Sequence, residues 1–450
     1  MRRIAEVFLL GFVATIPLQE YAASQIVPVA GTVTRLVGIA AAGVALTTLL
    51  QEAKLRKVSR ALLVMTLFVG FSWLSVLWGG RPTSAMTRSI TNMQLLAMVL
   101  IFSQFAWNQP FVRKLFQAYV IGSWSAVFVQ IQAYRSGTAY AQEFIGQTIR
   151  YTAFDNDPNE MALTMALAIP FAWYLVATAT NRKAFWNRFL VFVNGGYLVG
   201  AAFGVLLTGS RGGLIALTLA ALALPLSYIY LRASKKALLF SALVVGSLIA
   251  VNFIPAETWK RLATISEAAR EARYDASEAN VRVLIWEQGL QTFISDPRVT
   301  VVGVGAANFM EGVEPVHGER FVAHNTFISV LVELGIIGFL LFTTIYIWCW
   351  RVVLRRMEGL ERITFICVML CWTSGVMFLT YEQQKETWLI FGVILARETA
   401  LPLAREGSLM RSVLHTISGT PPRIMNRSPR ARKVGRMPGE LVGNQASQTV

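Results

Sequence analysis

The sequence predicts an all-α polytopic membrane protein with about twelve transmembrane helices. Hydrophobic residues fill 55% of its 450 positions and charged residues only 15%, a balance too apolar for a soluble protein. Apolar stretches close to the length of one bilayer crossing recur along the chain, and basic residues gather in alternate connections between them. Because these stretches are continuous rather than alternating, we expect helices and not a closed barrel of strands.

The expected spans follow one another through most of the chain. They lie near residues 6–19, 28–50, 61–79, 90–107, 111–132, 160–180, 189–208, 213–231, 236–254, 325–350, 363–381 and 386–402. The first apolar run leads through TIPLQEYAAS into the second, which favours an uncleaved first helix over a signal peptide.

Basic residues set the expected orientation, because they are enriched in cytoplasmic loops. If Arg2 and Arg3 are cytoplasmic, every second connection is basic. The basic residues of these connections are Lys54, Arg56, Lys57, Arg60, Arg113, Lys114, Arg182, Lys183, Arg188, Arg232, Lys235, Lys236, Arg351, Arg355, Arg356 and Arg362. Both termini are therefore expected in the cytoplasm.

Two long connections remain on the opposite side of the membrane, at residues 133–159 and 255–324. The second is rich in Ala, Glu, Leu and Arg with apolar residues at helical spacing, which predicts one or two amphipathic helices. Beyond residue 402 the chain is basic and rich in Ser, Pro and Gly. We therefore expect a membrane domain over 1–402 and a basic, disordered cytoplasmic tail over 403–450.

The net charge of +16 follows largely from this topology, so membrane lipids are the expected partners and no nucleic acid is indicated. Cys349, Cys367 and Cys371 all fall within expected spans. They predict packed free thiols rather than a disulfide framework or a zinc site.

An arginine interrupts the apolar sequence LLTGSRGGLIALTLAALAL at residues 206–224. Ser210 is suited to cap a helix that begins near Arg211, and such a helix start offers backbone N–H groups to an anion. Gly212 and Gly213 would let a ligand approach the backbone, and the guanidinium matches phosphate oxygens. The same residues fit a tightly packed turn whose arginine reaches lipid headgroups equally well.

Other polar residues also fall at the outer ends of the spans. Arg282 lies near the start of an expected amphipathic helix, where a solvated arginine is the simpler interpretation. His324, together with Asn325, opens the span HNTFISVLVELGIIGFLLF, and histidine is suited to accept a proton near neutral pH. Glu333 lies deeper, where an intramembrane carboxylate indicates either a functional site or an interhelical hydrogen bond.

The stretch RYTAFDNDPNEMALTMALAIP begins at Arg150, which is either a phosphate contact or an ordinary loop charge. Asp157, Pro158 and Glu160 have the pattern of a helix start: a capping side chain, a proline at the first position and a carboxylate at the third. Helix capping is a sufficient explanation for these three residues.

The segments GSRGGLIAL, NVRVLIWEQGLQTFISDPRVTVVGVGAANF and AHNTFISVLVELGIIGFLLF occur in this order. Their combination resembles the O-antigen ligase and O-antigen polymerase superfamily of bacterial membrane glycosyltransferases, and FDNDPNEMA resembles a further element of that family. The likeness covers residues 150–340. It implies a multi-spanning glycosyltransferase of the bacterial inner membrane whose active site and long, partly helical loop face the periplasm.

The resemblance also implies a donor and residue roles. The donor would be an undecaprenyl-diphosphate-linked glycan, and the acceptor a glycan or lipid A-core. Arg211 and Arg282 would bind the diphosphate, with Arg150 as a third candidate, while His324 would act on the acceptor hydroxyl. Ser210, Gly212, Gly213, Asn325 and Glu333 would support them.

The expected reaction is direct displacement with inversion at the anomeric carbon, without a metal or cofactor. The superfamily leaves three acceptors open. A ligase would transfer a finished polysaccharide to an acceptor such as lipid A-core, a polymerase would transfer a growing chain to a lipid-linked repeat unit, and an O-oligosaccharyltransferase would glycosylate a protein. A lipid-glycan transporter is the alternative from another class. It is disfavoured because the sequence shows no internal repeat and its unusual polar residues gather at one face.

Overall fold

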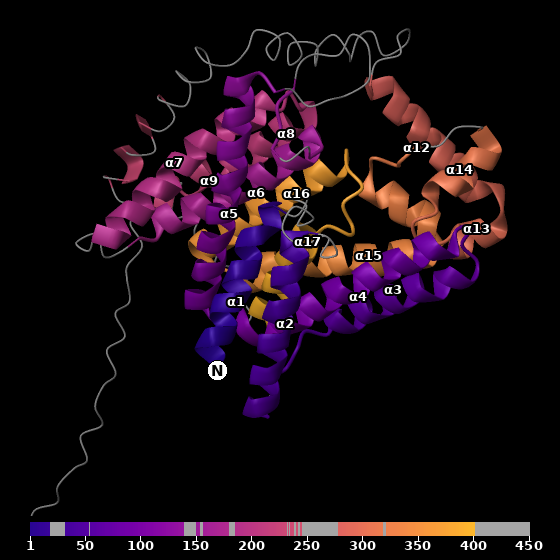
Figure 1. Cartoon of the computed structure of the whole chain (residues 1–450), viewed down its shortest axis with the longest axis horizontal. Coiled ribbons are helices and arrows are strands. Elements are labelled where there is room, and N and C mark those ends of the chain that lie inside the picture. The colour runs from indigo at the N-terminus through magenta and orange to yellow at the C-terminus, as the bar shows by residue number, and fades with distance from the viewer. Residues whose placement is uncertain are drawn as a thin grey trace, which may run out of the picture. The chain divides into compact units, whose positions relative to one another are not determined.

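The computed structural model describes residues 1–18, 32–53, 55–138, 150–153, 156–179, 185–231, 278–317 and 321–400, with a few positions between 233 and 244. The chain divides into a unit of Met1–Ala404 and a second unit of Arg405–Val450, and the expected tail lies outside the described residues. Within the described residues every regular element is a helix (Figure 1). The α-helices are α1 (Arg2–Thr15), α2 (Val33–Glu52), α3 (Ala61–Leu74), α4 (Pro82–Phe105), α5 (Gln109–Ser136), α6 (Pro158–Ala177), α7 (Phe185–Leu207), α8 (Arg211–Ala221), α9 (Ala223–Leu226), α12 (Glu278–Ser295), α13 (Pro297–Val302), α14 (Phe309–His317), α15 (Thr326–Arg356), α16 (Gly359–Val376) and α17 (Lys385–Glu398).

Seven helices of the described chain are long and apolar enough to cross a membrane. They are α2, α4, α6, α7, α8 with its continuation to Tyr230, α15 and α16. The multi-pass helical character predicted from the sequence is therefore confirmed, whereas the number of about twelve spans is not. Three of the expected spans form α-helices of only 14 residues, α1, α3 and α17, and most of the expected span at 236–254 lies outside the described residues.

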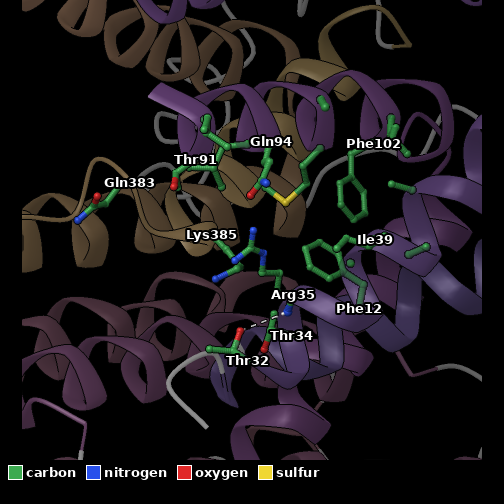
Figure 2. Close-up of a pocket in the computed structure, with 18 of the residues that line it drawn as sticks. Phe12, Thr32, Thr34, Arg35, Ile39, Thr91, Gln94, Phe102, Gln383 and Lys385 are labelled. Atoms are coloured by element: carbon green, nitrogen blue, oxygen red, sulfur yellow. Dashed lines mark hydrogen bonds between the residues drawn. The ribbon is translucent and has the colours of Figure 1, made fainter. Parts of the chain in front are cut away.

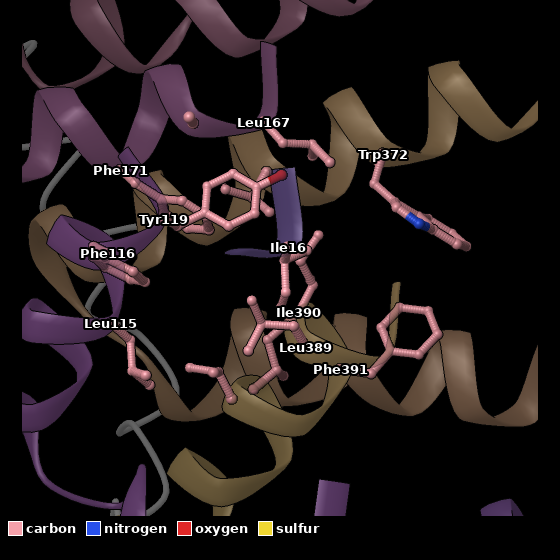
Figure 3. Packing of buried hydrophobic residues seen from close by; sticks show 14 of the residues in the cluster. Ile16, Leu115, Phe116, Tyr119, Leu167, Phe171, Trp372, Leu389, Ile390 and Phe391 are labelled. Carbon is pink, nitrogen blue, oxygen red and sulfur yellow. The ribbon is translucent and has the colours of Figure 1, made fainter. Parts of the chain in front are cut away.

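Helix α6 lies at the centre of the bundle and packs against α5, α7, α8 and α16. Its most apolar window is 94% buried, whereas the corresponding windows of the other candidate spans are at most 61% buried. The physical reason is that α6 is apolar on all sides, and such a helix is stable where protein surrounds it. Figure 3 shows the neighbouring core, where Phe171 of α6 stacks on Phe116 of α5 with ring centroids 4.3 Å apart.

Contacts between distant segments gather the predicted cytoplasmic loops at one end of the bundle, called here the basic end. Arg2 donates to the backbone oxygen of Gln104, and Arg397 pairs with Glu361 and also donates to the backbone oxygen of Trp107. A cavity at this end is lined by basic residues from two of the predicted loops, namely Lys57, Arg60, Arg351, Arg355 and Arg356. The alternation of basic loops along the sequence therefore corresponds to a spatial grouping.

The described part of the second long connection contains three helices, α12, α13 and α14, where one or two were expected. Asp296 caps α13 by accepting from the backbone N–H of Arg298 at 2.8 Å, and α13 packs against α15. At this contact α15 is kinked at Gly335, whose φ is +60°. A Cβ there would lie 2.4 Å from the backbone oxygen of Val301, so only glycine permits the approach.

The three cysteines are confirmed as free and buried residues. Cys349 lies in α15, and Cys367 and Cys371 lie in α16. They contribute to packing between helices, as small apolar side chains do.

Candidate active site

The starts of α6 and α8 lie side by side and are joined by polar contacts. Ser210 caps α8 by accepting from the backbone N–H of Gly213 at 2.9 Å, and its hydroxyl donates to Oδ1 of Asn159 at 2.7 Å. Asp157 caps α6 by accepting from the N–H groups of Asn159 and Glu160 at 2.7 and 3.2 Å. The helix starts predicted at Asp157 and Ser210 are therefore confirmed, and their positive dipole ends face the same region.

Arg150 connects these two helix starts. Its Nε donates to the backbone oxygen of Thr208 at 2.9 Å, and its Nη2 donates to Oδ1 of Asn159 at 3.2 Å. Arg150 is only 3% exposed. The alternative interpretation from the sequence, an ordinary loop charge surrounded by solvent, is therefore wrong. Arg150 is a buried charge held by the turn that leads into Arg211.

Arg211 is the first residue of α8 and is half-buried. The two glycines after it permit close packing within the protein. A Cβ on Gly213 would lie 2.4 Å from the Cβ of Ala162 in α6, and one on Gly212 would lie 3.2 Å from the ring of Phe378. The tightly packed turn considered from the sequence therefore describes the glycines, while Arg211 as a whole is half-buried and its Nε is buried.

His324 lies at the start of α15. Its backbone has a φ of +45°, a left-handed conformation that histidine adopts more readily than most residues. The next residue, Asn325, caps α15 by accepting from the N–H groups of Phe327 and Ile328 at 3.0 and 3.1 Å. The half-buried His324 is thus fixed one residue before the positive end of a third helix.

Arg282 lies on α12, a helix that contacts the segment before His324. Trp286, one turn further along α12, donates from its indole N–H to the backbone oxygen of Ala323 at 3.0 Å. Residues four apart share a helix face, so the half-buried Arg282 lies on the face of α12 that contacts the segment before His324. The sequence motif alone favoured a solvated helix face for this arginine.

A short connecting segment after α16, residues 377–384, joins the two groups of residues. Phe378 lies against Gly212 at the start of α8, and the backbone oxygen of Met377 accepts from Asn325 Nδ2 at 3.3 Å. Thr326 donates to the backbone oxygen of Leu379 at 2.8 Å. The starts of α6, α8 and α15 therefore gather at one end of the bundle, and we call this arrangement the helix-start cluster.

Glu333 lies apart from the helix-start cluster and has a bracing role. Its Oε2 accepts from the backbone N–H of Ala307 at 2.8 Å and lies 3.7 Å from Nη1 of Arg88. The same Arg88 nitrogen donates to Oε1 of Glu382 at 2.6 Å. The hydrogen bond considered from the sequence thus goes to a turn rather than to another helix, and the link of Glu333 to another helix is its ion pair with Arg88 of α4.

Sequence reasoning missed Asn159, Arg88 and Glu382. Asn159 lies within the helix-start pattern of Asp157, Pro158 and Glu160, and those three residues already accounted for the pattern. Arg88 lies just before the expected span 90–107, and an arginine near a span end is ordinarily a headgroup contact. Because its partners lie more than 200 residues away, local spacing contained no signal for the network.

Asp155 and Asp157 have an Asp-x-Asp spacing, a pattern that can hold a divalent cation. Asp157 uses Oδ1 to cap α6, and Asp155 lies outside the described residues. The described residues contain no group of three His, Cys, Asp or Glu side chains placed to hold a metal. Metal independence stays a prediction.

Comparison with known proteins gives two similarities. Residues 196–343 match the family model described as O-antigen ligase, a segment that includes Arg211, Arg282 and His324 but not Arg150. The chain is also 25% identical over 310 residues to the exopolysaccharide production protein ExoQ of Rhizobium meliloti (strain 1021). That match covers 66% of each chain, just under two thirds of the relative's length. The two similarities agree with the resemblance that the sequence motifs carry, and the family match is limited to residues 196–343.

Proposed function

We propose that the chain transfers a glycan from an undecaprenyl-diphosphate-linked donor to a hydroxyl acceptor at the helix-start cluster. The observation that supports this most directly is the gathering of the starts of α6, α8 and α15 with Arg150 and Arg211. Helix starts and guanidinium groups both favour phosphate oxygens. Arg282 and His324 belong to the same end of the bundle through the contact of Trp286 with Ala323.

The reaction requires one bond to form and one to break. The acceptor hydroxyl oxygen attacks the anomeric carbon while the bond from that carbon to the diphosphate oxygen breaks, which inverts the carbon. His324 accepts the hydroxyl proton, and the released diphosphate keeps the electron pair of the broken bond. Arg211 and Arg282 stabilise the charge that develops on the diphosphate, so the leaving group needs no proton. General base catalysis of this kind contributes typically ~10²–10⁴-fold to the rate.

Glu333 enters this proposal only as a supporting residue. It braces α15 against the Val304–Ala307 turn, so it holds the helix that carries His324 and Asn325. The proposed location is the bacterial inner membrane, with the helix-start cluster facing the periplasm and both termini in the cytoplasm. This orientation is supported by α15, which begins in the cluster and ends with Arg355 and Arg356 at the basic end.

A ligase-like role in lipopolysaccharide or surface polysaccharide synthesis is the first candidate, because the matched family model is described as O-antigen ligase. Its acceptor would be a glycan such as lipid A-core. A polymerase role is the second candidate, favoured by the similarity to a protein named for exopolysaccharide production. The chemistry at the diphosphate is the same in both.

The test is glycan transfer by the purified, full-length chain in lipid nanodiscs, with an undecaprenyl-diphosphate glycan as donor. Separate reactions contain lipid A-core or a second lipid-linked repeat unit as acceptor, each with and without a metal chelator. We expect product with the chelator present and a loss of at least about 100-fold in His324→Ala and in Arg211→Ala. His415→Ala, in the tail, is the matched control. Wild-type rates in both site variants would refute the proposal.

A further inference from the structure

The cavity at the basic end has a volume of about 580 Å³ and lies between the α2–α3 connection and the ends of α15 and α17. Its basic lining residues are Lys57, Arg60, Arg351, Arg355 and Arg356. Arg356 is half-buried and engaged in an interaction of its own. The other four side chains are exposed, and they form no ion pair with any residue that the structure describes. The cavity thus gathers four cations that lack a counter-ion in the described chain.

One carboxylate, that of Glu398, is among the described lining residues, and neutral groups hold it. The hydroxyl of Ser59 donates to its Oε2 at 2.5 Å, and the indole N–H of Trp348 donates to both of its oxygens at 3.2 Å. The positive charge of the cavity therefore exceeds its negative charge. Cations that share one space repel each other, and an anion among them converts that repulsion into attraction.

The helix dipole explains only part of this arrangement. Arg351 and Arg355 lie in the last two turns of α15, where the negative end of the dipole favours a cation. Arg60 immediately precedes α3, where the positive end of the dipole disfavours one. A bound anion would stabilise the cations of both helices.

The cavity of about 550 Å³ between α1, α2 and α4 is built differently (Figure 2). Figure 2 shows Phe12, Ile39 and Phe102 turned toward one another at one end of it. Its described lining includes two basic residues, Arg35 and Lys385, where the cavity at the basic end has five. An excess of cations therefore distinguishes the cavity at the basic end.

The face of α15 that leads to this cavity is apolar and exposed. Leu340, Ile347 and Leu354 repeat every seven residues and are 57, 58 and 46% exposed. Arg351 shares their face, because it lies four residues after Ile347 and three before Leu354. In a membrane such a face contacts acyl chains, so Arg351 lies where a lipid headgroup would follow them.

Helix α3 packs along α15 and repeats the arrangement (Figure 1). Leu63 and Leu67 of α3 are 64 and 53% exposed, and they follow Arg60 by three and seven residues. The cations of α3 and of α15 thus both end an exposed apolar face. This combination favours a lipid over a soluble anion, which has no acyl chain to place there.

We propose that the cavity at the basic end binds the phosphate of an anionic phospholipid, whose acyl chains lie along the exposed apolar faces of α3 and α15. Basic pockets between membrane helices suit such headgroups. Phosphatidylcholine and phosphatidylethanolamine fit less well, because each carries a cationic group that the arginines would repel. The site lies at the opposite end of α15 from the helix-start cluster and does not depend on the proposed glycan transfer.

Binding is tested with the full-length chain in phosphatidylcholine nanodiscs that contain a small share of phosphatidylglycerol with a photoreactive group on one acyl chain. After irradiation, mass spectrometry identifies the labelled peptides. We expect label in α3 and in the second half of α15, which unlabelled phosphatidylglycerol displaces and added phosphatidylcholine does not. Arg351→Gln with Arg355→Gln, and separately Lys57→Gln with Arg60→Gln, should each lower this label at least about tenfold, because each pair removes two cations from the headgroup.

A matched variant removes two positive charges from other predicted cytoplasmic connections. Lys114→Gln with Arg188→Gln changes two exposed residues that do not line the cavity, and it should leave the label unchanged. The basic tail stays in every variant, so its own attraction to anionic lipid is the same in all of them. Thermal unfolding in pure phosphatidylcholine nanodiscs should be close to wild type for both cavity variants, because the four altered side chains are exposed.

Three results would overturn the proposal. The first is label in α3 and α15 that both cavity variants retain. The second is an equal loss of label in the Lys114→Gln/Arg188→Gln variant, which would assign the label to general attraction between a basic surface and anionic lipid. The third is displacement of the label by inorganic pyrophosphate but not by sodium sulfate of equal ionic strength, which would assign the cavity to a soluble phosphate compound.

Discussion

At the scale of single residues, the arginines of the helix-start cluster differ in how their side chains are held. Arg150 is buried against Thr208 and Asn159, which suits it to hold the two helix starts together. Arg211 is half-buried at the first position of α8, where it adds a charge to the positive end of the helix dipole. The sequence identified both arginines as candidates, but no local pattern singled out Asn159, which accepts a hydrogen bond from Arg150.

Arg211→Lys tests whether the guanidinium shape matters in addition to its charge. A lysine keeps the positive charge but cannot form two parallel hydrogen bonds to a phosphate. We expect glycan transfer to fall about tenfold or more while the thermal unfolding midpoint stays within about 1 °C of wild type. The matched control is Arg298→Lys at an exposed position. Equal transfer by Arg211→Lys and wild type would show that a point charge is sufficient.

At the scale of elements, capping residues were the most reliable sequence signal. The caps predicted at Asp157 and Ser210 both accept backbone N–H bonds at the start of a helix, because capping is a local interaction within one turn. Asn325 caps α15 in the same way, although the sequence analysis did not predict it as a cap. The kink in α15 could not be predicted in this way. Gly335 sits in a continuous apolar run, and the need for glycine comes from Val301, which packs against it from α13.

Gly335→Ala should destabilise the protein by about 1–3 kcal/mol, because the new Cβ meets both an unfavourable φ and the backbone oxygen of Val301. Gly359→Ala provides the matched control. Its φ of +56° is similar, but no atom lies within 4 Å of the added Cβ, so only the conformational strain remains. Thermal unfolding in detergent should show a clearly larger loss for Gly335→Ala. Equal losses of stability in the two variants would mean that the contact between Val301 of α13 and residue 335 adjusts to the added Cβ without a loss of free energy.

At the scale of the whole molecule, the alternation of apolar spans and basic loops predicted a bundle of membrane helices. It also predicted which loops lie at the same end of that bundle. The same pattern overstated the number of full-length spans, because apolar composition extends into helices of 14 residues such as α1 and α17. It also gave no sign of the charges buried between helices. Arg88 pairs with Glu382, and Arg397 pairs with Glu361. In each pair the partners are too far apart in the sequence for a periodic residue pattern to predict the contact.

The pair of Arg397 and Glu361 provides the test of how these buried charges hold the bundle. Arg397 donates from Nε and Nη2 to the two carboxylate oxygens at 2.6 and 3.0 Å, and from Nη1 to the backbone oxygen of Trp107 at 2.5 Å. These contacts join α17, α16 and the turn between α4 and α5. Arg397→Met leaves a carboxylate buried without its cation, which we expect to cost about 3–5 kcal/mol of unfolding free energy.

Adding Glu361→Met to Arg397→Met removes the isolated charge, so the double variant should recover a large part of that loss. Lys114→Met, which breaks the exposed pair of Lys114 with Glu6, should cost less than about 1 kcal/mol. Thermal unfolding of the four proteins in the same detergent measures these differences. If the double variant were no more stable than Arg397→Met alone, the loss would come from the contact with Trp107 and from packing, and the ion pair would not be what joins α16 to α17.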